Sequence, residues 1–355
     1  MKRFLFLIMI NLILCGSSYL PAQAIEKNEN RIEDVGTTVN HVINTVKERI
    51  HLMGYAQLGY TYNDANNVDN DFDIKRIIFM AEGKITDQWS MFFMYNFNGG
   101  GTLLEMYTDY HILPGLSARL GQFKVPYTIE SPLSPTVVEL IDCYSQATNY
   151  LAAIGPHDPL RGATTGRDLG FMLYGNLFEN YLTYNLGAIN GQGINNRDKN
   201  SNKDFIGSLM ANPMKWLSVG GSFTTGKGCA IAPSDANPDL AVGDNYSRNR
   251  WAIGAVVETK PVSFRTEYLG GKDGHVKSNG YYATASAHVC PKFDIVASYD
   301  YLNKNKDLNM KQTNYVAGLQ YWFYPQCRLQ AQYTYSNKKD LDNANMLQAQ
   351  IQVRF

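Results

Sequence analysis

Charged and polar side chains recur at alternate positions along many segments of this chain, and they are its best candidates for chemistry. The cationic members are Arg76, Lys84, Arg119, Arg248, Arg250, Arg265, Arg328 and Arg354, and the acidic members are Glu82, Glu105, Asp109, Glu258, Glu267, Asp294 and Asp300. Residues two apart in a strand lie on the same face, so these side chains would line one surface. Rings of charge select among ions that pass through a pore, although each single charge is more often part of a structural ion-pair network.

A catalytic set is the competing interpretation of some of these residues. Ser286 and His288 are two apart, and Asp294 and Asp300 follow in the next strand-like segment. A serine hydrolase could be drawn from them, but no nucleophile-elbow motif accompanies the serine. The histidines form no His/Cys cluster with metal-ligand spacing. We therefore predict no enzyme, no metal site and no cofactor.

The elements that must position these residues are strand-like segments with a period of two, of which we count sixteen from Ile50 onward. They lie near 50–62, 72–85, 88–98, 102–113, 115–124, 167–175, 179–190, 203–212, 215–226, 248–260, 261–270, 277–290, 292–303, 312–324, 326–337 and 344–355. Most are long enough for a tilted strand to cross a bilayer, and single-chain bacterial barrels have an even strand number. The predicted fold class is all-β, a sixteen-stranded antiparallel transmembrane β-barrel.

The faces of these segments divide cleanly into apolar and polar sets. In 344–355, one face carries Leu347, Ala349, Ile351, Val353 and Phe355, and the other carries Gln348, Gln350, Gln352 and Arg354. In 326–337, Arg328, Gln330 and Gln332 oppose Leu329 and Ala331. A charge facing lipid near mid-membrane costs roughly 2–4 kcal/mol, so the segregation indicates lipid on one side and water on the other. An amphipathic edge strand is the alternative for any one segment.

The connections between segments alternate in length, with a tight exception at 99–101. The short set includes Thr86-Asp87, Pro114, Pro213-Met214, Pro291 and Pro325, and the long set includes 63–71, 125–166, 191–202, 227–247, 271–276, 304–311 and 338–343. Short turns on one side and long loops on the other are typical of outer-membrane barrels. Aromatic residues beside the short turns, Trp89, Trp216 and Trp322-Phe323-Tyr324, suggest an interfacial girdle.

The connection 125–166 is the longest, and its apolar content predicts that it packs inside the barrel. A barrel of sixteen strands is too wide for side chains alone to fill, so we expect this segment to set the narrowest point. Arg119 and Lys124 would lie at its base. A channel is therefore one hypothesis, and a plugged barrel with a receptor or attachment role is the other.

The N-terminal region predicts export. Lys2 and Arg3, the apolar run 4–14 and Ala22-Gln23-Ala24 fit a signal peptide over 1–24. Residues 25–49 carry Ile32, Val35 and Val39 at helical spacing and could form a short periplasmic helix, a coiled coil or a linker. The barrel would cover 50–355. Balanced totals of 32 basic and 32 acidic residues give no footprint for nucleic acid, and we expect outer-membrane lipid as the partner.

Two stretches resemble a known family. Phe72-Asp-Ile-Lys-Arg-Ile-Ile-Phe-Met-Ala-Glu-Gly83 is similar to the second hairpin of the phosphate-selective porins O and P, and Gly-Gln-Phe-Lys-Val-Pro-Tyr-Thr-Ile-Glu, ending at Glu130, is similar to the stretch before their constriction loop. The resemblance implies a homotrimeric porin that passes small hydrophilic or anionic solutes, phosphate among them. The chain departs from the family's anion-selective members, because acidic side chains accompany the cations on its inferred lumen face.

These considerations give one set of pore-lining or solute-binding candidates. They are Arg76, Asp109, Arg119, Lys124, Glu130, Arg265, Glu267, Arg328 and Gln332.

The cysteines beyond the signal offer a separate expectation, because an exported protein can form disulfides. Cys290 and Cys327 would lie about 14 Å apart across three strand spacings, beyond the roughly 7 Å limit between bridged α-carbons. That leaves either a bridge between Cys143 and Cys229 or four free thiols.

Overall fold

In this computed structural model the described residues are 49–65, 69–155, 160–162 and 164–355. The predicted signal peptide at 1–24, and the predicted helix or linker at 25–49 apart from its last residue, lie outside them. Across the described residues, no helix combines the length and apolarity needed to span a membrane.

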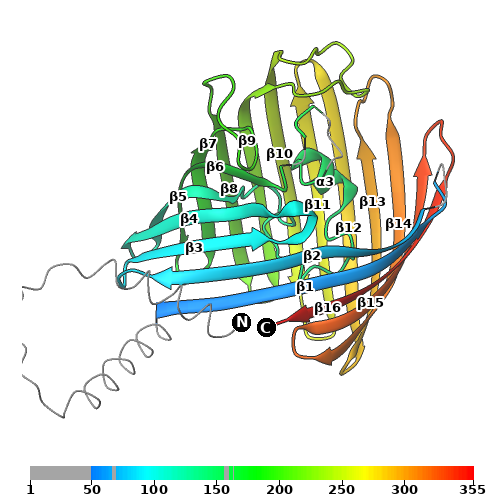
Figure 1. The fold of residues 1–355 in the computed structure, drawn as a ribbon, viewed down its shortest axis with the longest axis horizontal. Coiled ribbons are helices and arrows are strands. Elements are labelled where there is room, and N and C mark those ends of the chain that lie inside the picture. Colours follow the sequence, from blue (N-terminus) through cyan, green and yellow to red (C-terminus); the bar gives the residue numbers. More distant parts are fainter. Residues whose placement is uncertain (1–48, 66–68, 156–159, 163) are drawn as a thin grey trace, which may run out of the picture. The chain divides into compact units, whose positions relative to one another are not determined.

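The described chain forms a closed antiparallel barrel of sixteen strands, as predicted (Figure 1). The strands are β1 Ile50–Asn63, β2 Asp69–Lys84, β3 Trp89–Asn96, β4 Thr102–Leu113, β5 Leu116–Lys124, β6 Arg167–Leu177, β7 Leu182–Ile189, β8 Asp204–Met214, β9 Leu217–Cys229, β10 Asn245–Glu258, β11 Val262–Asp273, β12 Val276–Cys290, β13 Phe293–Asn303, β14 Lys311–Tyr324, β15 Cys327–Lys338 and β16 Ala344–Arg354. Each strand pairs with its sequence neighbours, and β1 closes the barrel against β16.

Side-chain alternation decides which face of each strand points outward. In β16, Leu347, Ile351 and Val353 are exposed on the outer surface, whereas Gln348 and Gln350 are buried on the inside. The neighbouring strand β15 has the same alternation, because its inward-facing Gln332 lies opposite Gln348 in the ladder. A slip of one residue would reverse both faces, so the apolar pattern fixes the register.

A β-bulge in β2 interrupts this alternation at one important place. Leu58 pairs with Ile74 and Gln57 pairs with Arg76, which leaves Lys75 as the extra residue. Ile74 faces outward before the bulge and Ile77, three residues later, faces outward after it; both are exposed. Bulges re-aim side chains at barrel walls, and here Lys75 and Arg76 both line the interior.

The connections correct one prediction. The segment 271–276 was expected to be a long loop, but β11 runs to Asp273 and β12 starts at Val276, and these two residues pair directly. Gly274 adopts a positive φ of 60°, a conformation that glycine accepts without strain and that a two-residue hairpin connection requires. The strands therefore continue further than the apolar pattern alone indicated.

The aromatic girdle also needs a correction at Trp322. Trp89, Trp216, Phe323 and Tyr324 are exposed on the outer surface. The indole of Trp322 instead donates to the Asp294 carboxylate at 2.7 Å, and Arg328 lies over its ring at 5.1 Å to the centroid. The ladder is irregular between Trp322 and Tyr324, which allows Phe323 and Tyr324 both to be exposed while Trp322 points inward.

Barrel closure depends on a close approach at Gly54. Its backbone exchanges two hydrogen bonds with Phe355, at 3.2 and 3.0 Å, and a Cβ on Gly54 would meet the Ile78 carbonyl oxygen at 2.9 Å and the Phe355 ring at 2.6 Å. We expect Gly54→Val to destabilise the folded barrel by about 1–3 kcal/mol, the usual cost of overpacking. The heat needed to convert the folded band to the unfolded band on a gel would measure this. Gly83→Val is the matched control, since a Cβ there meets nothing within 4 Å; equal losses in both variants would refute the explanation.

Candidate functional site

The segment between β5 and β6 packs against the inner wall of the barrel. It contains the short helix α3, Gln146–Leu151, which contacts β11, β12 and β13 (Figure 1). Tyr127, Tyr150 and Leu151 form a buried cluster with wall residues that include Leu269 and Tyr282. Burying these apolar side chains holds the segment inside the barrel, where its backbone groups must find partners.

Inward-facing glutamines of β14 to β16 supply many of those partners. The Gln330 amide donates to the Glu139 carbonyl at 3.0 Å, and the Gln332 amide oxygen accepts from the Ile141 N–H at 2.9 Å. Arg328 donates to the Val138 carbonyl at 2.8 Å and to Gln320 at 2.7 Å. Arg328 and Gln332 therefore bind the segment.

Carboxylates hold the other side of the segment. Glu267 accepts from the Ile129 N–H at 2.8 Å, and Asp300 accepts from the Gln146 N–H at 2.6 Å. Arg265 pairs with Glu139, and it lies 3.9 Å from Glu130. The Glu130 carboxylate in turn accepts from the Ser145 N–H at 2.9 Å within the segment itself.

Burial raises the pKa of Glu130 above its usual 4.5, against the opposing effect of Arg265. The other Glu130 oxygen, Oε1, has no hydrogen-bond partner among the described residues. Burial disfavours the charged form of a carboxyl, so the folded protein favours the protonated form of Glu130 more than the unfolded chain does.

This state of Glu130 predicts a pH dependence. A raised folded-state pKa means that the folded protein binds the proton more tightly than the unfolded chain does. The loss in the free energy of unfolding that Glu130 causes is therefore absent below pH 4.5 and grows as the pH rises above it. We expect Glu130→Gln to remove that part of the pH dependence of stability, measured by thermal unfolding in detergent between acidic and neutral pH. A Glu130→Gln curve parallel to wild type would contradict the interpretation.

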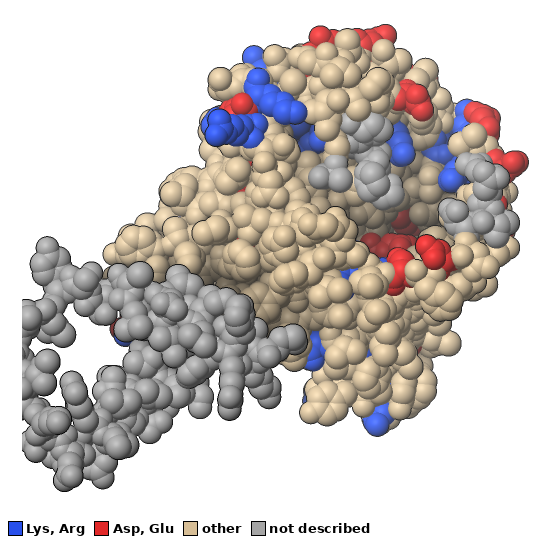
Figure 2. All heavy atoms as spheres, viewed as in Figure 1, with Lys and Arg blue, Asp and Glu red and all other residues tan. Residues whose placement is uncertain are grey.

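Two cavities are lined by different parts of the segment. The first, of about 530 Å³, is lined by segment residues from Pro126 to Pro135 and by wall residues of β1, β3 to β9 and β11. The second, of about 630 Å³, is lined by segment residues from Leu140 to Gly155 and by wall residues of β1, β2 and β13 to β16. Acidic and basic side chains both lie around the hollow on the face that Figure 2 shows.

Lys124 lines the first cavity and bonds to a residue that lines the second. Its ammonium donates to the Ser131 and Leu133 carbonyls at 3.0 and 2.6 Å. Its third bond, of 2.9 Å, goes to the hydroxyl of Tyr144, which lines the second cavity. Arg76 lines the second cavity and donates to the Gln57 amide oxygen at 2.8 Å. Both cations thus bond to neutral oxygens.

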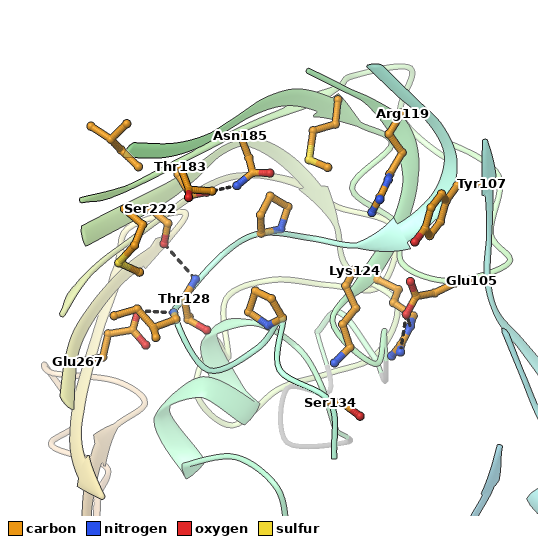
Figure 3. Close-up of a pocket in the computed structure, with 18 of the residues that line it drawn as sticks. Glu105, Tyr107, Arg119, Lys124, Thr128, Ser134, Thr183, Asn185, Ser222 and Glu267 are labelled. Carbon is orange, nitrogen blue, oxygen red and sulfur yellow. Dashed lines mark hydrogen bonds and ion pairs between the residues drawn. The ribbon is translucent and has the colours of Figure 1, made fainter. Parts of the chain in front are cut away.

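Arg119 lies further along β5 and is already paired. It forms two 2.8 Å bonds to the Asp109 carboxylate, and its guanidinium lies 3.7 Å from the centroid of the Tyr107 ring. Figure 3 shows Arg119, Tyr107 and Lys124 on one side of the first cavity, with Thr183, Asn185 and Ser222 on the other.

Of the nine predicted site residues, Lys124 lines the first cavity and Arg76 lines the second. Five others hold the segment in place: Glu130, Arg265, Glu267, Arg328 and Gln332. Asp109 and Arg119 form a wall pair. Sequence reasoning missed Lys75, because strict alternation would have directed it outward. The apolar residues Ile74 and Ile77 are three positions apart, whereas strict alternation requires an even spacing, and this odd spacing is the signal that could have revealed Lys75.

The four described cysteines are free, so the alternative of a Cys143–Cys229 bridge is not formed. Cys143 is buried within the segment and has a positive φ of 71°.

Comparisons with known proteins agree with this architecture. A family model described as phosphate-selective porin O and P matches residues 46–215, and one described as Gram-negative porin matches residues 173–341. No curated protein matches the chain.

Solved structures share the fold at low sequence identity. An anion-selective porin from Comamonas acidovorans has a TM-score of 0.64 at 14% identity, covering 86% of this chain and 99% of its own. OmpT of Vibrio cholerae, in a trimer form, has a TM-score of 0.62 at 12% identity over 86% of this chain and 99% of its own. The DcaP channel of Acinetobacter baumannii has a TM-score of 0.59 at 13% identity over 86% of this chain and 97% of its own. The family models of porins together match residues 46–341, and the closed barrel matches solved outer-membrane porins, so the chain is similar to this class of channel over most of its length.

Proposed function

We propose that the barrel is a water-filled channel for passive diffusion of small hydrophilic solutes, that it prefers anions, and that the segment 125–166 sets its narrowest point. The observation that carries this proposal is the grouping of Lys75, Arg76 and Lys124 around the two cavities. Arg76 bonds to the neutral amide oxygen of Gln57, so its positive charge is available to attract anions over a few ångströms.

The preference should be moderate. Asp73 and Asp142 share the second cavity with Lys75, and the Lys75 ammonium lies 4.0 Å from the Asp142 carboxylate. In the first cavity Glu105 pairs with Arg167 at 2.7 Å. Phosphate enters the proposal through the family model over residues 46–215, and the anion-selective Comamonas porin supports anions in general.

A plugged barrel is the second candidate function, and the anchoring of the segment favours it. Contacts reach the segment from β1, β9, β11 and β13 to β16, for example through Gln57, Ser222 and Gln352. A barrel closed in this way would serve as a receptor or attachment protein at the cell surface.

Current across a planar bilayer separates the two candidates. Purified wild-type protein should give stepwise, long-lived open-channel currents in concentrated potassium chloride. Insertion of folded protein without any steps would instead support the plugged barrel.

We also propose a homotrimer, exported by the predicted signal peptide and embedded in outer-membrane lipid. The trimer form of the structurally similar OmpT supports this assembly. Chemical cross-linking in detergent should give a limiting species of three chains, whereas a monomer at all cross-linker concentrations would contradict it.

A further inference from the structure

The first cavity combines an apolar lining with five charged side chains, Glu105, Arg119, Lys124, Arg167 and Glu267. The segment contributes Pro126, Ile129, Pro132 and Pro135 to it, which places an apolar strip beside the path. The wall adds more apolar and aromatic surface from Tyr55, Met94, Tyr107 and Met172. The second cavity also mixes the two kinds of lining, with Leu140, Ile141 and Val316 beside Asp73, Lys75 and Arg76.

Each arginine of the first cavity already donates through a pair of guanidinium nitrogens, its donor fork, to a neighbouring carboxylate. Arg119 uses its Nε and one terminal nitrogen on Asp109, at 2.8 Å each. Arg167 uses the same pair of nitrogens on Glu105, at 3.0 and 2.7 Å, and donates its remaining terminal nitrogen to the Thr165 carbonyl at 2.9 Å. Tight recognition of phosphate draws on free forks of this kind.

Lys124 contributes a buried amine to the same cavity, and its donors are already occupied. All three of its donors go to neutral oxygens. An anion that enters this cavity therefore meets few open donors, and the neighbouring apolar surface decides which anions remain there. A cavity of about 530 Å³ has the size and the mixed apolar and polar lining of a small-molecule site.

We propose that the first cavity favours amphipathic organic anions, namely carboxylates with an aryl or alkyl body, over inorganic phosphate and over polyhydroxylated anions. The apolar body contacts the strip from Pro126 to Pro135, and the carboxylate lies toward Lys124 and Arg119, which share one side of the cavity (Figure 3). Thr183, Asn185 and Ser222 face that side and complete a polar lining for water. This inference rests on the proposed anion-preferring channel and names its solute class.

The test uses full-length protein in planar bilayers carrying a chloride current. Benzoate, threonate (a polyhydroxy carboxylate of similar size) and inorganic phosphate are each added at the same concentration. We expect benzoate to block the current transiently and to remain bound longer than the other two anions. Equal block by benzoate and threonate, or strongest block by phosphate, would overturn the inference.

Matched variants assign the effect to the cavity. Ile129→Thr combined with Pro132→Ser removes apolar surface from the first cavity, and benzoate affinity should fall about tenfold. Val316→Thr makes the same type of change in the second cavity and should leave the block unchanged. A loss in both variants, or in neither, would contradict the assignment. A wild-type channel that prefers cations would instead refute the proposed function, so the two failures are distinguishable.

Discussion

Reversing the charge of the bulge pair, in Lys75→Glu with Arg76→Glu, is expected to turn the anion preference into a cation preference. Both side chains line the second cavity, so each reversal replaces attraction for an anion with repulsion. A unit charge changes the energy of an ion about 4 Å away by about 1 kcal/mol in water. Two reversals should therefore alter the anion-to-cation permeability ratio on the order of tenfold or more, read from the zero-current potential in a salt gradient.

Lys292→Glu is the matched control for this pair. Lys292 is exposed in the short connection between β12 and β13, so its reversal should leave the zero-current potential close to wild type. Arg119→Gln should have a smaller effect than the bulge pair, because Asp109 already neutralises Arg119. If the double reversal at Lys75 and Arg76 left the zero-current potential unchanged, these cations would not lie along the ion path.

Arg265→Met is expected to release part of the segment from the wall. Arg265 faces Glu139 and Glu130, and all three are largely buried. Removing one partner of a buried ion pair typically costs 3–5 kcal/mol, because the remaining charge loses its counterion. The hydrogen bonds between the barrel strands would remain. We therefore expect a folded protein whose current is noisier than that of wild type and whose segment 125–166 is cleaved faster by protease.

The double variant Arg265→Met with Glu139→Met tests the cause of that release. Replacing both partners of a buried pair with apolar residues is often neutral, so the double variant should recover much of the wild-type protease resistance. Current and cleavage in Arg265→Met that match wild type would show that other contacts, such as those of Arg328 and Gln332, hold the segment alone.

The strands could be predicted from sequence because lipid and water impose opposite demands on the two faces. The expected segment 277–290 became β12 at Val276–Cys290, and 344–355 became β16 at Ala344–Arg354. Gln348, Gln350 and Gln352 were placed on the inner face for the same reason, and they are buried there. Exceptions arose where the local geometry departs from strict alternation, as at Lys75, or where a glycine permits a tighter turn, as at Gly274.

The contacts of the segment 125–166 could not be predicted in the same way. It has no repeating period, so its partners depend on which inward side chains satisfy its backbone groups. Sequence identified Glu130 and Glu267 as candidates, but it could not show that Glu267 accepts from the N–H of Ile129 beside Glu130. The pairing of Arg119 with Asp109 likewise depends on the register between β4 and β5.

The zero-current potential of the wild-type channel across a gradient of potassium chloride is the most direct test of this account. With Lys75, Arg76 and Lys124 at the two cavities, the sign of that potential should show that chloride is more permeant than potassium. A potential of the opposite sign in channels that conduct steadily would contradict the account.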